Sequence, residues 1–281
     1  MAAKLQKVKH DYSQDIDAQR GIEFQFWSKK LGTLGILTCE ILELEFADLI
    51  ATDKLVDKIT VFEDERSVRL IESLESLNVP RLNRIKEMNA FVSASDCRFE
   101  VLIQVLQLAL HNSKRTLQQG LQEAARAFEP HVDALMLGYG LCGNALEKPA
   151  ELLSDVGVPI FIPMDKDHPV DDCIGLLIGG RERYYGEQCK VAGTFFMIPG
   201  WTYHWRRMFE REFGNLTPTM AKRLFEHYDR SLLIQTPIMC LEEMRRNTEA
   251  FNEMFGFRTD VCEGSMTILK KTWDSVKAHL I

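Results

Sequence analysis

The sequence is informative first for what it lacks. No stretch approaches the ~20 consecutive apolar residues that a membrane-spanning helix needs, and the polar N-terminal segment has no apolar core of a secretory signal. The net charge is -7, and no basic stripe of the kind that binds nucleic acid is present. We therefore expect a cytoplasmic protein that binds neither membrane nor nucleic acid. Its seven cysteines should then be reduced thiols or metal ligands rather than disulfides.

Signatures of common cofactors are also missing. The cysteines form no Cys-x-x-Cys pair, so no strong metal motif is present. The glycine-rich run 138–143 matches neither a phosphate loop nor a full G-x-G-x-x-G fingerprint, and no nucleotide is assigned. There is no internal repeat, low-complexity run or linker. A functional site must therefore be argued from where the fold places reactive side chains.

The hydrophobic pattern alternates short apolar runs with helical stretches. This order is typical of an α/β fold with a doubly wound, mainly parallel sheet, as in Rossmann-like proteins. We expect a polar extension over residues 1–30 and a single α/β domain over 31–281. A charged helical pattern broken at Pro80 predicts a helical insertion, a hairpin of two helices, at about 63–97. The predicted strands are 33–38, 58–62, 100–106, 133–137, 158–162, 194–198 and 231–235.

Three cysteines follow predicted strands at the point where each strand leads into a helix. Cys39 follows the first strand, Cys142 lies in the run GYGLCGN after the strand at 133–137, and Cys173 follows the strand at 158–162. Because the carboxyl ends of parallel strands share one edge of a sheet, the three thiols are expected to converge there. A helix between 145 and 154 would also place Cys142 near a helix N-terminus, where the dipole favours a thiolate. The alternative is three buried packing residues.

Other reactive side chains are expected near the same edge. Glu40 beside Cys39 could carry protons, or could be a first-turn acid favoured by the helix dipole. His111 follows a strand and is either a ligand, a proton donor or a capping residue. His168, five residues before Cys173, is a candidate general base or plain polar surface.

The loop around Cys142 is predicted to approach a bound group closely. Gly138, Gly140 and Gly143, with Asn144, permit a tight turn and contact between backbone and ligand. Arg181, past the helix that follows Cys173, could hold an anionic substrate or cofactor.

Three thiolates suit two kinds of metal centre. Zinc bound by three protein ligands keeps an open fourth position. A four-iron, four-sulfur (4Fe-4S) cluster with three protein ligands leaves one iron free for substrate. The residues do not choose between the two.

These segments resemble a family catalogued as domain of unknown function 1638. The resemblance is carried by the following segments, of which GYGLCGN is the most specific: 36–40, 110–111, 135–144, 171–174, 179–185, 193–194 and 199–201. Asp172 stands where the family commonly has His, and the segment around 63–97 is additional. The resemblance implies anaerobic one-carbon metabolism such as methanogenesis. It also implies a corrinoid protein or methyltransferase as partner, but it supplies no reaction.

We therefore hypothesise a cytoplasmic protein that binds a metal or iron–sulfur cluster through Cys39, Cys142 and Cys173. An enzyme, a lyase or transferase acting on a small molecule, is favoured over an accessory factor because three ligands leave a position open. The alternatives are a zinc-dependent methyltransferase and a metal-free small-molecule-binding module. Whether the chain forms a homo-oligomer is left open.

Overall fold

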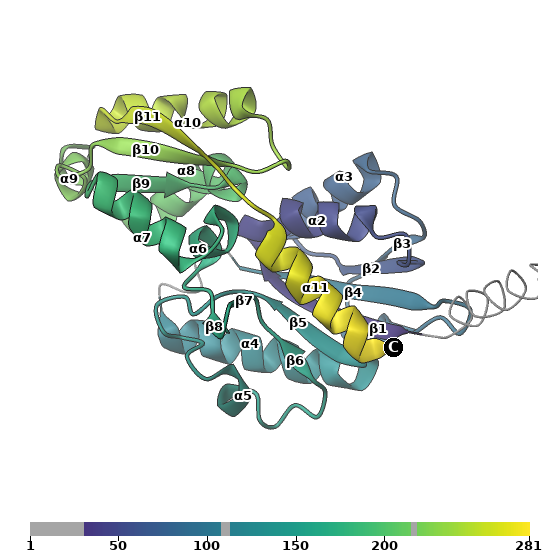
Figure 1. Ribbon diagram of the computed structural model, residues 1–281. Coiled ribbons are helices and arrows are strands. Elements are labelled where there is room, and N and C mark those ends of the chain that lie inside the picture. Colours follow the sequence, from purple (N-terminus) through teal and green to yellow (C-terminus); the bar gives the residue numbers. More distant parts are fainter. Residues whose placement is uncertain (1–30, 108–112, 215–217) are drawn as a thin grey trace, which may run out of the picture.

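The computed structural model describes residues 31–107, 113–214 and 218–281, and its centre is a six-stranded parallel sheet (Figure 1). The strand order is β3-β2-β4-β1-β5-β6, and each described pairing within it is parallel. The fold is therefore a doubly wound, Rossmann-like α/β fold, as predicted. The strands are β1 Gly32–Cys39, β2 Lys58–Phe62, β3 Leu82–Ile85, β4 Phe99–Leu106, β5 Ala134–Gly138 and β6 Ile160–Phe161.

Helices cover this sheet, which explains the nearly continuous apolar sequences of its central strands. All eight residues of β1 are buried, as are all five of β5. Parallel strands packed between two helical layers have nearly continuous apolar sequences because neither face of the sheet is exposed to water. In Figure 1, α2 (Glu43–Thr52) and α3 (Val68–Ser76) lie on the opposite side of the sheet from α4 (Lys114–Phe128).

The segment 63–97 requires a correction. It contains one helix, α3, and not a hairpin of two helices. After Pro80 the chain forms β3, which pairs with β2 in parallel and becomes the edge of the sheet, and then the short 3-10 helix η2 (Met88–Ala90). Two of the four residues of β3 are exposed, as an edge strand allows. Their polar side chains interrupt the apolar pattern of a buried strand, so the sequence favoured a helix.

A second parallel sheet holds the remaining long strands. It has the order β11-β10-β9, with β9 Thr194–Met197, β10 Arg230–Gln235 and β11 Arg258–Glu263. Alternate residues of β10 serve two apolar clusters: Leu232 and Ile234 join the main core, and Leu233 joins a second, aromatic-rich cluster. This period of two is that of a strand covered on both faces.

The connecting elements complete the described chain. A two-stranded antiparallel hairpin, β7 Met164–Asp165 and β8 His168–Pro169, follows β6. The helices are α5 Pro149–Leu152, α6 Cys173–Ile178, α7 Arg181–Lys190, α8 Pro199–Phe213, α9 Pro218–Leu224, α10 Leu241–Phe255 and α11 Thr267–Leu280, with 3-10 helices η1 Glu40–Leu42 and η4 Glu129–His131.

The last helix returns from the second sheet to the first (Figure 1). Helix α11 packs against β5, and its Trp273 and Lys277 side chains donate to Oδ2 of Asp53, at the end of α2, at 2.6 and 2.7 Å. The two sheets are thus tied together by the end of α11 as well as by the shared apolar core.

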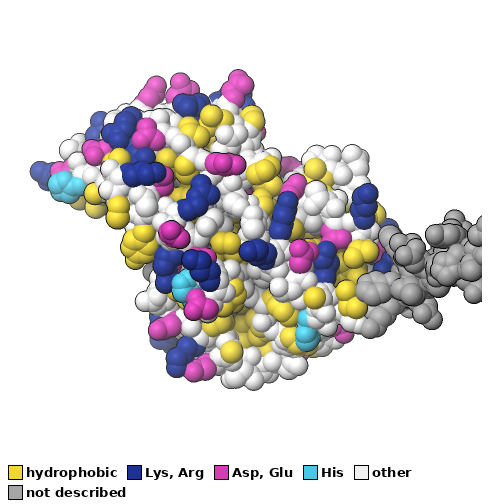
Figure 2. All heavy atoms as spheres, in the orientation of Figure 1, with side chains coloured by type: hydrophobic (Ala, Val, Ile, Leu, Met, Phe, Trp, Pro, Cys, Tyr) yellow, Lys and Arg dark blue, Asp and Glu magenta, His cyan; other side chains and the backbone are white. Residues whose placement is uncertain are grey.

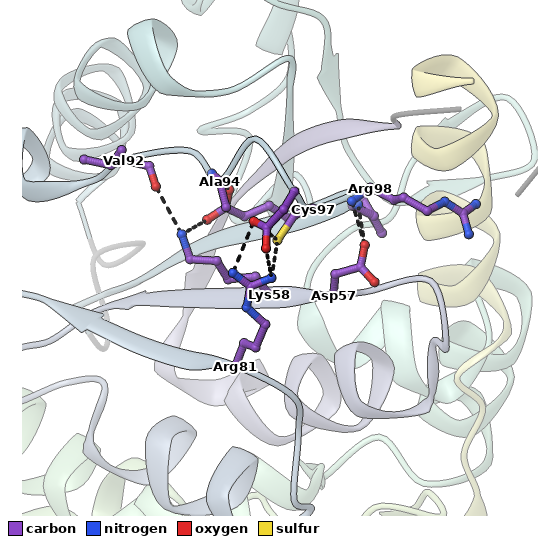
Figure 3. A network of polar contacts seen from close by, with 10 residues as sticks. Asp57, Lys58, Arg81, Val92, Ala94, Cys97 and Arg98 are labelled. Carbon is purple, nitrogen blue, oxygen red and sulfur yellow. Dashed lines mark hydrogen bonds and ion pairs between the residues drawn. The ribbon is translucent and has the colours of Figure 1, made fainter. Parts of the chain in front are cut away.

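A polar network closes the amino-terminal edge of the first sheet (Figure 3). Lys58, at the start of β2, forms a buried ion pair of 2.7 Å with Glu100 of β4. The Cys97 sulfur accepts a hydrogen bond from the Arg81 guanidinium at 3.2 Å. Because β1 and β4 are parallel, Cys97 before β4 and Cys39 at the end of β1 lie at opposite ends of the sheet. Cys97 is therefore no part of the site described below.

No helix among the described residues is long and apolar enough to cross a membrane. The face shown in Figure 2 carries basic and acidic side chains interspersed, with no stripe of one sign.

Candidate functional site

The carboxyl edge of the first sheet brings two of the predicted cysteines together. Strands β1 and β5 are neighbours, with Thr38 opposite Gly138. Cys39 is the last residue of β1, and Cys142 lies in the turn that leaves β5. The two cysteines therefore leave adjacent strands at the same edge, as the pattern predicted.

The loop carrying Cys142 is bonded to the segment that leads into Cys173. Leu141 N–H donates to the Val170 carbonyl at 2.8 Å, and Cys142 N–H donates to the Asp171 carbonyl at 2.9 Å. Gly140 makes this approach feasible, because a Cβ there would lie 2.5 Å from the Val170 carbonyl oxygen. The glycine thus lets Cys142 reach Cys173, the first residue of α6.

The backbone at Cys142 is strained. Cys142, Gly143 and Asn144 follow one another with φ angles of 45°, 66° and 62°, all in the left-handed region. Such a conformation costs about 1–3 kcal/mol for each non-glycine residue and persists where the surroundings enforce it, often at functional sites. Here the bonds from Leu141 and Cys142 to the facing loop supply that constraint.

Burial controls the ionisation of the three thiols. Burial, with a smaller contribution from the nearby Cys142 thiol, raises the pKa of Cys39 from its ordinary 9.0 to about 12. Burial also raises the pKa of Cys142 to about 12. The pKa of Cys173 lies well above its ordinary value because of burial, Asp172, Cys142 and Cys39. The three sulfurs therefore lie close enough to influence one another and are protonated at neutral pH without a cation.

The expected helix-dipole effect on Cys142 is wrong. Helix α5 has only four residues and begins at Pro149, so Cys142 sits in a turn and not at a helix N-terminus. Cys173 does begin a helix, yet desolvation outweighs any dipole and its pKa rises.

A nearby N–H group opposes the effect of burial on the pKa of each thiol. The backbone of Ile41 lowers the pKa of Cys39, and that of Gly140 lowers the pKa of Cys142. The Trp201 side chain lowers the pKa of Cys173. An N–H group near a sulfur favours the deprotonated or metal-bound form over the thiol.

Tyr139 adds a buried hydroxyl without a partner among the described residues. Burial raises its pKa well above the ordinary value, and the charges of Cys39, Cys142 and Glu40 raise it further. The hydroxyl is therefore close to two of the three thiols. A buried polar group without a partner usually marks a water, an ion or a ligand.

Two of the thiols open onto a cavity of about 350 Å³. Its walls come from the Cys142 turn, α6, α7, β9 and the start of α8, so it lies between the two sheets. The lining residues are Cys142, Gly143, Asp172, Cys173, Ile174, Tyr184, Gln188, Thr194, Phe195, Phe196, Trp201 and Tyr228. Asp172 caps α6 by accepting from Gly175 N–H, and its other oxygen accepts from the Tyr184 hydroxyl at 3.3 Å. Burial raises the pKa of Asp172, and these hydrogen bonds oppose the rise.

Glu40 is tied to α8. It is buried, and its carboxylate pairs with Arg207 at 2.7 Å. Behind it, Glu43 pairs with His204 at 2.8 Å, and His204 is also buried. The Glu40 carboxylate lies close enough to raise the pKa of Cys39, but it is held in the ion pair with Arg207. It is also the acidic residue in the first turn of η1.

The remaining predicted residues are placed less centrally. His111 lies outside the described residues. His168 is on β8, opposite Asp165 in the hairpin, and does not line the cavity. Arg181 forms a two-pronged pair with Asp171, at 2.5 and 3.1 Å, and likewise lies outside the cavity lining. Gly138 and Gly140 are buried, Gly143 lines the cavity, and Asn144 is exposed beyond it.

The thiols do not form a closed metal site as they lie. Within residues 31–107, 113–214 and 218–281, no group of three or more His, Cys, Asp or Glu side chains is placed to hold a metal ion. The donor set itself, three soft sulfurs each with an N–H group nearby, suits a thiophilic metal. All seven cysteines of the chain are free, and Cys189, Cys240 and Cys262 line no part of this cavity.

Sequence reasoning did not assign roles to Tyr139, Asp172 or Trp201. Tyr139 and Asp172 each stand beside a predicted ligand, at the start of the Cys142 turn and directly before Cys173. Trp201 lies far from Cys173 in the sequence, and only the tertiary fold brings the two residues together.

Comparisons with known proteins identify a family for this chain but no activity. No curated protein and no solved structure matches the chain. Residues 105–273, which include Cys142, Cys173 and the cavity walls, match the family described as "Protein of unknown function (DUF1638)". Since this match covers more than half of the 281 residues, the chain belongs to that family.

Proposed function

We propose that the protein binds a thiophilic metal ion or an iron–sulfur cluster through Cys39, Cys142 and Cys173. One observation supports this most: each thiol is largely buried, lies within electrostatic range of another, and has a nearby N–H group that lowers its pKa. Packing cysteines have no need of such N–H groups, since a neutral thiol is a small hydrophobic group.

The electrostatics support a bound cation. Three buried thiols with raised pKa values disfavour the thiolate form in the absence of positive charge, and their mutual repulsion adds to the cost. A metal ion would reverse this balance, because its charge lowers the pKa of a coordinating thiol outright. The Tyr139 hydroxyl, which has no partner among the described residues, would then have a sulfur or metal-bound group to donate to.

The chemistry follows from the number of ligands. A metal held by three protein sulfurs has a position open to a small molecule, where it acts as a Lewis acid or binds a transferable group. Cys142 and Cys173 line the cavity, so a small molecule would reach this position from there. Trp201 and Gly140 would hold their sulfurs in place, and the aromatic walls would exclude water. We propose an enzyme on this basis.

The first experiment is metal analysis of protein purified without oxygen. About four irons and four sulfides per chain, with a brown colour bleached by dithionite, would identify the cluster. About one zinc and no iron would identify a zinc site and would favour the thiolate- or methyl-transfer alternative. No metal after purification and reconstitution would contradict the proposal.

The ligand assignment is tested by Cys142→Ala, with Cys262→Ala as the matched control. Cys262 is also half-buried with a pKa raised by burial, to about 11, but it lies on β11 away from the cavity. We expect Cys142→Ala to lose the metal while keeping a cooperative unfolding transition, and Cys262→Ala to keep both. Equal metal content in the two variants would remove Cys142 from the ligand set.

A metal-free binding module is the second candidate, and one observation favours it. As they lie, the described side chains form no closed metal site, whereas the cavity is already formed. A protein that contains no metal but binds a small molecule in the cavity would establish this alternative. A corrinoid partner and an anaerobic setting remain predictions from the resemblance, and a cytoplasmic location remains a prediction from the sequence.

A further inference from the structure

The cavity next to Cys142 and Cys173 has an unusual combination of walls. Rings of Tyr184, Phe195, Phe196, Trp201 and Tyr228 form much of its lining. Several of these rings meet edge to face, among them Tyr184 on Phe196 with centroids 4.8 Å apart and Phe195 on Trp201 at 5.7 Å. Such contacts limit how the rings can turn, so the aromatic wall of the cavity is preformed.

The charged groups in these walls are of one sign. Among the residues that the structure describes, the lining contains the carboxylate of Asp172 and no Lys, Arg or His. The guanidinium of Arg181 is engaged by Asp171 outside the lining. Arg230 donates from Nε to the hydroxyl of Thr194 in the lining at 2.9 Å, but its guanidinium is itself paired with Glu187 and Asp260. A ligand in the cavity therefore meets a carboxylate and aromatic side chains, and the nearby guanidinium already has its own carboxylate partners.

A bound metal would leave this polarity in place. Three thiolates bring one negative charge more than a divalent ion neutralises, so a zinc site of this kind is itself anionic. The polarity of the cavity is thus the same in either form of the protein.

We propose that the cavity binds a small organic cation, an alkylated ammonium group carried on a compact body. Aromatic faces attract such cations through their quadrupoles, and a nearby carboxylate adds direct attraction. An anion would be repelled by Asp172, and a neutral apolar molecule would gain nothing from this carboxylate, whose present partners are the neutral donors Gly175 N–H and the Tyr184 hydroxyl. The inference rests on the proposed function only in that the cation would lie beside the open position of the metal.

The test uses choline as the probe and 3,3-dimethylbutan-1-ol, its neutral isostere, as the comparison. Calorimetric titration of the full chain purified without oxygen is expected to show choline binding at least about tenfold tighter than the alcohol. Acetate is expected not to bind. Equal affinity for choline and the alcohol, or no binding of choline, would overturn the proposal.

Variants of the lining residues, with one control outside the lining, test whether choline binds in this cavity. Tyr228→Leu removes a ring from the cavity, and Tyr185→Leu removes an exposed ring of α7 outside it. We expect the first to weaken choline binding about three- to tenfold and the second to leave it unchanged. Asp172→Asn should also weaken it about tenfold, while the asparagine still caps α6. If Tyr228→Leu and Asp172→Asn both bind choline as well as the natural protein does, the cation does not occupy this cavity.

The outcome is independent of the metal proposal, because metal content is measured on the same samples. Metal without choline binding would overturn the cation site alone. Choline binding without metal would overturn the metal site alone. Thermal unfolding of every variant shows whether a loss of binding reflects a loss of fold.

Discussion

At the scale of single residues, desolvation has the largest effect on the pKa values of the buried thiols and of one buried carboxyl group. Burial raises the pKa values of Cys39, Cys142 and Cys173, and Glu45 on α2 is a second case. Its side chain is fully buried, and neither carboxyl oxygen has a hydrogen-bond partner among the described residues. Burial raises the pKa of Glu45 from 4.5 to about 8, and the neighbouring Glu43 adds to the rise.

This shift predicts a destabilising effect at neutral pH. Since the folded state holds the Glu45 proton more tightly than the unfolded state, stability falls as the pH rises from about 4.5 to about 8. Glu45→Gln should therefore raise the free energy of unfolding at pH 8 by on the order of 1–3 kcal/mol and change it little at pH 4.

Urea unfolding at the two pH values measures this difference. Glu72→Gln, an exposed position on α3, is the control and should change stability at neither pH. A Glu45→Gln variant less stable than the natural protein at pH 8 would mean that this carboxylate has a partner outside the described residues.

At the scale of elements, the turn after β5 and the segment before α6 behave as one unit. Gly140 sits where the two meet, and a Cβ there would lie 2.5 Å from the Val170 carbonyl oxygen and 2.9 Å from the Asp172 backbone. Both neighbours are backbone atoms, so no side-chain rotation relieves the contact. The juxtaposition of Cys142 and Cys173 therefore depends on this glycine.

Gly140→Ala is accordingly expected to lower the free energy of unfolding by about 2–4 kcal/mol and to abolish metal binding. Gly143→Ala is the matched control: nothing lies within 4 Å of its Cβ position, and only its left-handed φ of 66° is affected. That change should cost about 1 kcal/mol and preserve the metal. Chemical denaturation and metal analysis test both, and equal effects of the two variants would contradict the role given to Gly140.

Elements of the first sheet were largely predictable, and the reason is their burial. Strands such as β1 and β2 are apolar runs bounded by polar turns, and the predicted bounds agree within one residue. Strands β3 and β11 were missed because exposed side chains interrupt their patterns. Helix α5 was predicted too long, since Pro149 and the turn at 142–146 confine it to four residues.

At the scale of the whole molecule, α11 fastens the second sheet to the first through Asp53. This carboxylate is mostly buried, which by itself raises its pKa. Hydrogen bonds from Lys277 and Trp273 outweigh that effect and bring the pKa below the ordinary 3.8. Because folding lowers the pKa of Asp53, the stability that its carboxylate contributes is present above pH 3.8 and is lost as the pH falls through the folded-state pKa.

Asp53→Asn is therefore expected to lower the free energy of unfolding by about 1–3 kcal/mol at pH 7. The difference from the natural protein should shrink below pH 3.8, where the carboxylate of the natural protein begins to be protonated. Asp274→Asn is the control, because this exposed residue contacts the same Lys277 at 3.3 Å. Its effect should be under about 0.5 kcal/mol. Urea unfolding at pH 7 and pH 3 provides the test, and a pH-independent cost for Asp53→Asn would argue for a packing role instead.

The sequence by itself determined the α/β class and the positions of the buried strands. It also determined that Cys39 and the Cys142 turn leave parallel strands, because apolar periodicity reflects burial and parallel strands end at a common edge. Only the tertiary structure decided which of these residues share a cavity. The separation of β9, β10 and β11 into a second sheet, the return of α11 and the placement of Trp201 and Asp172 around the thiols depend on packing between distant segments. Local periodicity carries no record of such contacts, and the same packing sets the desolvation that keeps the three thiols neutral.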